Sequence, residues 1–149
     1  MSAITSSLNE LIETLKNGEL GFGEAGKEAK DPNLKRVFSE YSAQRKGFAS
    51  ELQGFVSKQG AEPEDSGTLA GSVHRGWINL RATVASREDL AILEECERGE
   101  DSAVETYEEA ISGGDLGQAE AVVAAQLTKI RAAHNRIRDL RNSLDATEK

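Results

Sequence analysis

The chain has 149 residues, of which 38% are hydrophobic, a length and composition that suit one domain with a sizeable core, residues 1–149. Its net charge of -8, without any block of Lys or Arg, argues against a nucleic-acid partner because the phosphate backbone would be repelled. A single cysteine excludes a disulfide within one chain, and no apolar run approaches the roughly 20 residues of a membrane span. We therefore expect a soluble, cytoplasmic protein.

Apolar residues three and four apart dominate the chain and alternating runs are rare, so the predicted fold class is all-α. A first helix can begin at Ser7, which has capping-box spacing to Glu10, and ends near residues 27–33. Its inward stripe comprises Leu8, Leu11, Ile12, Leu15, Glu19, Phe22 and Gly26. Asp31 and Pro32 provide an N-cap and a first helical residue for the second helix. The stripe of that helix comprises Leu34, Phe38, Tyr41, Arg45, Phe48, Leu52 and Phe55.

A break at "GAEPEDSG" is followed by a shorter apolar helix, and this crossover of about residues 60–86 is expected to join two helical hairpins. The next helix begins after a cap at Ser86 and ends at Gly113 and Gly114. Its stripe comprises Leu93, Cys96, Glu97, Glu100, Val104, Tyr107 and Ile111. The last stripe comprises Ala119, Val123, Gln126, Ile130, Ala133, His134, Ile137, Leu140 and Leu144. One long crossover makes the second and third long helices parallel.

Three stretches, "DSGTLAGSVHRGWINL", "ECERGED" and "AAHNRIRDLR", resemble a bacterial ferritin-like family built on a four-helix-bundle domain of unknown function. The resemblance covers almost the entire chain. It implies a ferritin-like four-helix bundle of two antiparallel hairpins joined by a long crossover containing an extra helix. It also suggests a bacterial stress or storage context, but it implies no settled activity.

Charged residues interrupt the apolar stripes at one height of the expected bundle. Glu19 lies about 12 residues before the first turn and Arg45 about 14 after it, so the two are level in an antiparallel hairpin. Glu100, about 13 residues into the third long helix, reaches the same height if the crossover returns the chain to the first-turn end. A guanidinium beside two carboxylates forms bidentate hydrogen bonds. We therefore predict a structural polar layer of Glu19, Arg45 and Glu100.

The alternative is a metal site that uses Glu19, Glu97, Glu100 and His134 to bind iron, manganese or zinc while Arg45 swings away. Di-iron bundles take an inward Glu from two helices and Glu-x-x-His from the other two. Glu19 and Glu100 meet the first requirement, whereas "YSAQRKGF" and "RAAH" lack the Glu-x-x-His pattern. The constellation is therefore degenerate, with half of the expected ligands missing.

The remaining residues of chemical interest have structural interpretations. His74 and Trp77 on the crossover are expected to pack, and Cys96 to act as a small buried hydrophobe. Helical glycines at 18, 21, 23, 26, 47 and 54 indicate either close helix approach or access for a bound partner. A solvated acidic face is expected from Glu94, Glu95, Asp101, Glu105, Glu108 and Glu109.

No standard enzyme signature occurs in the chain. The leading hypothesis is a non-enzymatic ferritin-like bundle that acts through self-association, with a homodimer favoured, or through a protein partner. The competing hypothesis is a metal-binding ferritin-like protein or oxidase. A nucleoid-protecting bundle is disfavoured because the chain ends "RNSLDATEK" without a basic cluster.

Overall fold

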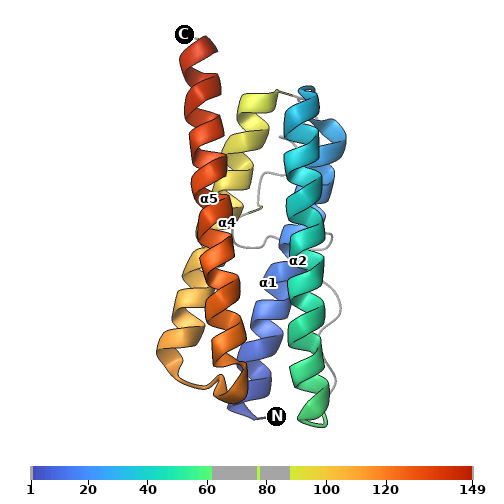
Figure 1. Ribbon diagram of the computed structural model, residues 1–149, viewed down its shortest axis with the longest axis vertical. Helices are drawn as coiled ribbons and strands as arrows, with labels where there is room; N and C mark the ends of the chain where they lie inside the picture. The colour runs from blue at the N-terminus through green and yellow to red at the C-terminus, as the bar shows by residue number, and fades with distance from the viewer. Residues whose placement is uncertain (1, 62–76, 78–87, 149) are drawn as a thin grey trace.

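The computed structural model describes residues 2–61, 77 and 88–148, which form a bundle of four long helices (Figure 1). The predicted all-α class is confirmed for this part of the chain. In order, the elements are α1 (Ala3–Glu28), α2 (Pro32–Lys58), α4 (Asp89–Gly113), the short 3-10 helix η1 (Gly117–Ala119) and α5 (Glu120–Glu148). The extra helix predicted within the crossover lies outside the described residues, apart from Trp77.

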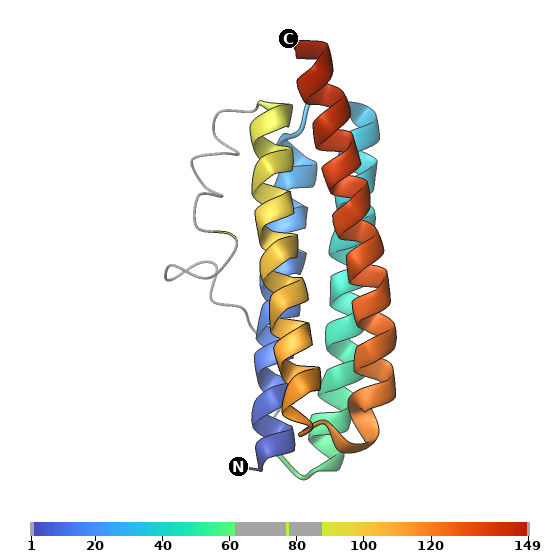
Figure 2. The same cartoon turned by 90° about the vertical axis from the view of Figure 1, so that its left-hand side faces the viewer.

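The helices form two antiparallel hairpins, α1–α2 and α4–α5, and α2 runs parallel to α4 (Figures 1 and 2). A carboxylate fixes this arrangement at one end of the bundle. The two oxygens of Asp89, at the start of α4, accept hydrogen bonds from the backbone N–H groups of Lys30 and Asp31 at 2.8 and 3.0 Å. The beginning of α4 is thereby held at the turn between α1 and α2, as the long crossover predicts.

Local sequence signals explain most helix ends. Asp31 is the N-cap of α2 and accepts a hydrogen bond from Asn33 N–H, with Pro32 as the first helical residue. Gly114 ends α4 in the left-handed conformation, at φ 71°, which glycine adopts without a steric penalty. The predicted start of α1 at Ser7 was wrong: Ser2 caps the helix five residues earlier by accepting a hydrogen bond from the Thr5 N–H.

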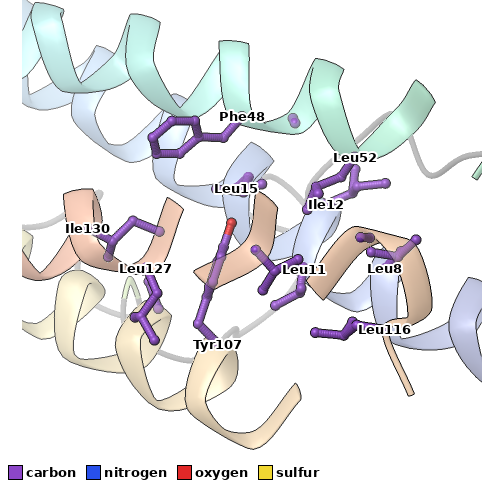
Figure 3. Packing of buried hydrophobic residues seen from close by; sticks show 14 of the residues in the cluster. Leu8, Leu11, Ile12, Leu15, Phe48, Leu52, Tyr107, Leu116, Leu127 and Ile130 are labelled. Atoms are coloured by element: carbon purple, nitrogen blue, oxygen red, sulfur yellow. The ribbon is translucent and has the colours of Figure 1, made fainter. Parts of the chain in front are cut away.

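The core divides along the bundle into two apolar clusters. The Tyr107 cluster, at the N-terminal end of α1, contains Leu8, Leu11, Ile12, Leu15, Phe48, Ala49, Leu52, Val56, Ala103, Tyr107, Leu116, Ala119, Val123, Leu127 and Ile130. Figure 3 shows Tyr107 between Leu11 and Leu127. The Trp77 cluster, at the other end, contains Phe22, Ala25, Ala29, Leu34, Val37, Phe38, Tyr41, Trp77, Ile92, Leu93, Cys96, Ala133 and Ile137. All four long helices contribute to both clusters.

Trp77 is buried against glycines on two helices. A Cβ atom added at Gly21 of α1 or at Gly99 of α4 would lie only 2.6 or 2.3 Å from the indole ring. The ring also meets Phe22 edge-on, with centroids 5.4 Å apart. These two glycines therefore provide room for Trp77, in agreement with its predicted packing role.

Within the described residues, no helix combines the length and apolar character that crossing a membrane requires.

Candidate functional site

A buried ion pair lies between the two apolar clusters. Arg45 of α2 follows Tyr41 of the Trp77 cluster and precedes Phe48 of the Tyr107 cluster, and Glu100 of α4 stands likewise between Cys96 and Ala103. Both side chains are 1% exposed. Two parallel hydrogen bonds join them, one from Arg45 Nη1 to Glu100 Oε1 and one from Nη2 to Oε2 at 2.6 Å. This bidentate geometry is the strongest form of an Arg–carboxylate contact.

Further contacts hold the guanidinium of Arg45 in place. Its Nε donates to Gln44 Oε1 at 3.1 Å, and its carbon lies 5.3 Å from the centre of the Phe22 ring. Gly18 on α1 faces the Arg45 side chain, since an added Cβ there would meet Arg45 Cγ at 3.4 Å, an ordinary contact distance. The charge is thus enclosed by α1, α2 and α4.

The pair sets the electrostatics of the bundle centre. Burial disfavours the charged form of Arg45, but the charge and hydrogen bonds of Glu100 outweigh it and raise the Arg45 pKa above its ordinary value. Burial, aided by the carboxylates of Glu100 and Glu95, raises the pKa of the Cys96 thiol well above its usual range. Cys96 is therefore held as a neutral thiol, whereas a reactive cysteine needs a lowered pKa.

Glu19 does not join this pair, which corrects the predicted three-member layer. Its side chain is 24% exposed, and its carboxylate lies 3.3 Å from Lys16 Nζ, one turn back on α1. Its backbone oxygen accepts a hydrogen bond from Ser42 Oγ at 2.8 Å. The inward position at this height of α1 is taken by Gly18, next to Arg45, and the longer glutamate side chain reaches the bundle surface.

A second polar chain crosses the Tyr107 cluster. The buried Tyr107 hydroxyl donates to Gln126 Oε1 at 2.7 Å, and Gln126 Nε2 donates to the Phe48 carbonyl at 3.3 Å and to Glu51 Oε1 at 3.2 Å. Burial raises the Tyr107 pKa, which keeps the phenol a hydrogen-bond donor. The sequence did contain a sign of this network, because Gln126 is a polar residue at an inward position of the last stripe. The sequence analysis assigned it no role.

The four predicted metal ligands are not brought together as one set. Glu100 pairs with Arg45 and Glu19 with Lys16. Glu97 and His134 do meet between α4 and α5, and the third group beside them is Asp101, which the sequence placed on a solvated face. One ligand atom of each of these three residues lies within 4.8 Å of the others.

The rest of the acidic face is exposed, with one exception. Glu94, Glu105, Glu108 and Glu109 are exposed, as predicted. Glu95 is only 2% exposed and forms an ion pair with Arg98, one turn further along α4, so its assignment to the solvated face was wrong. The interface of α4 with its neighbours is therefore wider than its apolar stripe alone.

Comparison with known proteins adds a family but no activity. Among curated protein sequences, none matches this chain. A model described as a domain of unknown function (DUF2383) matches residues 3–113, which include α1, α2, the crossover, α4 and the Arg45–Glu100 pair. Because the match spans well over half of the 149 residues, the chain belongs to the DUF2383 family.

Proposed function

We propose that the protein is a non-enzymatic ferritin-like bundle that acts through binding, by self-association or through a protein partner, and that its central metal position is degenerate. The observation that carries the proposal is the Arg45–Glu100 pair. Ferritin-like di-metal bundles hold their ions between facing helices, with inward carboxylates as ligands. Here the inward carboxylate of α4 is already bound by a guanidinium from α2.

The chemistry of the pair opposes a core metal in two ways. Each Glu100 oxygen already accepts a hydrogen bond from Arg45, so a metal at this carboxylate would have to compete with both. Arg45 also adds a fixed positive charge that would repel a cation, and releasing it would leave a buried charge unpaired, at a cost of about 3–5 kcal/mol. The centre is better suited to specifying helix register than to redox chemistry.

The setting we propose is the cytoplasm of a bacterium, with a role in stress or storage, as the family resemblance suggests. A free, buried cysteine suits a reducing compartment. A dimer is the favoured assembly, because symmetric dimers are the commonest soluble oligomers.

Light scattering on the full chain, combined with anaerobic iron loading, tests this function. We expect twice the chain mass of 16.1 kDa and no iron whose retention depends on Glu19 or Glu100. A strict monomer that captures no partner would contradict action by association. Iron lost on Glu19→Ala and Glu100→Ala, in folded protein that oxidises it, would overturn the non-enzymatic assignment.

The second candidate is a metal-binding protein or oxidase that uses Glu19, Glu97, Glu100 and His134 with iron, manganese or zinc. The observation that favours it is the proximity of Glu97 and His134. Stoichiometric metal that is lost in Glu19→Ala and in His134→Ala alike would support this set. Metal that responds to His134→Ala alone would place the ion elsewhere.

A further inference from the structure

We propose that Glu97, Asp101 and His134 form a binding site for one divalent first-row transition-metal ion on the outer surface of the α4–α5 hairpin. The site shares no ligand with the Arg45–Glu100 pair, and it goes beyond the proposed function, which holds with or without it.

Helix geometry brings the three side chains together. Glu97 and Asp101 are four residues apart on α4, so they lie on one face one turn apart. His134 of the antiparallel α5 faces them, and its Nε2 lies 2.5 Å from Asp101 Oδ1. The ligand set therefore comes from two packed helices, which are more rigid supports than loops.

The three ligand atoms lie within 4.8 Å of one another, so modest side-chain movements would bring them to a small cation. Zinc binds imidazole nitrogen and carboxylate oxygen at about 2.0–2.2 Å, so neighbouring ligands of a tetrahedral site lie about 3.3–3.6 Å apart. The Asp101 carboxylate must then retreat slightly from His134. This movement is inexpensive because the Asp101 side chain is 63% exposed, whereas Glu97 and His134 are more enclosed, at 19% and 21%.

Neighbouring groups orient two of the ligands. His134 Nδ1 lies 3.2 Å from Asn135 Oδ1, an oxygen that also accepts from Arg138 Nη1 at 3.4 Å. When a metal is bound, an Nδ1–H donated to this oxygen leaves the Nε2 lone pair for the ion; without a metal, the 2.5 Å contact with Asp101 needs a proton between the two atoms. Glu97 forms an ion pair with Arg141, which contacts both of its oxygens. Arg141 competes with a metal there, but it is 29% exposed and can turn to solvent, whereas the buried Arg45 cannot leave Glu100 without remaining an unpaired charge. Such outer contacts are typical of metal ligands and tune their affinity.

The donor types select the class of ion. One imidazole nitrogen and two carboxylates suit zinc, iron(II) or manganese(II), whereas calcium and magnesium favour sites made of oxygen alone. Three protein ligands leave at least one position for water. The site should therefore prefer Zn²⁺ strongly over Mg²⁺.

Isothermal titration of the full chain with Zn²⁺ tests the proposal, with circular dichroism to confirm folding of each variant. We expect one ion per chain, with affinity reduced about 10- to 100-fold or more in His134→Ala and in Asp101→Asn. The matched control is Glu94→Gln, which removes an exposed carboxylate from the same helix outside the site and should leave affinity unchanged.

Three results would overturn it: no binding of Zn²⁺ by the folded wild type, undiminished binding by His134→Ala, or Mg²⁺ binding as tight as Zn²⁺. The last result would indicate a general attraction of cations to the acidic face. None of these results bears on the oligomeric state, so the outcome is separable from that of the proposed function.

Discussion

The Arg45–Glu100 pair is expected to depend on both partners being present. Replacing Glu100 by Ala leaves the Arg45 guanidinium buried without its carboxylate, because the site is enclosed by three helices. The expected loss in the free energy of unfolding is about 3–5 kcal/mol, measured by urea denaturation.

A double variant, Arg45→Met with Glu100→Leu, is the control. Removing both charges together eliminates the uncompensated group, so the double variant should be much more stable than Glu100→Ala and close to the wild type. If the double variant is as unstable as the single one, the loss reflects packing rather than the unpaired charge, and this account of the core is incorrect.

Cys96 gives the bundle a predictable alkaline sensitivity. Its folded-state pKa is raised well above the ordinary value of 9.0, so the unfolded chain releases the thiol proton first as pH rises. The contribution of the neutral Cys96 thiol to the free energy of unfolding is therefore fully present below pH 9.0. Above that pH it declines, by up to about 1.4 kcal/mol per pH unit. Unfolding of the wild type and of Cys96→Ala should be compared at pH 8 to about 10.5. If the free energy of unfolding changes equally with pH in the two proteins, the pKa of Cys96 is not raised.

The residues at the centre were predictable to different degrees. Arg45 and Glu100 stood out because each is charged at an inward position of an apolar stripe. Glu19 satisfied the same criterion, but helical spacing fixes only the position of Cα, and a glutamate at the edge of a stripe can turn to the surface and pair with Lys16. Glu95 and Arg98 have the i, i+3 spacing of a helical ion pair, but spacing does not show that Glu95 is buried while Arg98 is exposed.

At the scale of elements, Trp77 is the one described residue of the crossover, and it packs against α1 and α4. Gly99→Ala should place a methyl group inside the volume of the indole ring, where the nearest ring atom is 2.3 Å away. We expect a loss of about 1–3 kcal/mol, as for other overpacked cores. Because Trp77 is the only tryptophan, its fluorescence should report the displacement directly.

Gly47→Ala on α2 is the matched control, since an added Cβ there would meet nothing within 4 Å. Alanine is the better helix former by about 1 kcal/mol, so this variant should be more stable than the wild type. Destabilisation by both substitutions, or by neither, would contradict the role assigned to Trp77. A Trp77→Ala background should remove most of the penalty at Gly99.

Helix ends were predictable where the chemistry of one residue fixes them. Asp31 followed by Pro32 identified the start of α2, and Gly114 identified the end of α4. The start of α1 was misplaced because both Ser2 and Ser7 are good N-caps, and the pattern alone favoured the one with a capping box. The longer helix also buries Thr5, so tertiary packing decided between the two.

At the scale of the whole molecule, two hairpins and a long crossover followed from periodicity and turn signals. The hydrogen bonds that join the two hairpins could not be predicted in this way, because Asp89 is 58 to 59 residues from Asp31 and Lys30 in the sequence. The Asp101–His134 contact is of the same kind, since it depends on the register of α4 against α5. Contacts of this kind need the assembled fold before they can be identified.

The last helix, α5, should be required for folding, although the DUF2383 match ends at residue 113. Val123, Leu127 and Ile130 of α5 pack in the Tyr107 cluster, and Ile137 packs in the Trp77 cluster. Each such side chain contributes about 1.5–3 kcal/mol when buried, so their combined loss approaches the 5–15 kcal/mol stability of a typical domain. A chain of residues 1–113 should therefore lack cooperative thermal unfolding by circular dichroism, and a peptide of residues 114–149 should restore it. Cooperative unfolding of residues 1–113 alone, at the midpoint of the full chain, would show that the two clusters do not depend on α5.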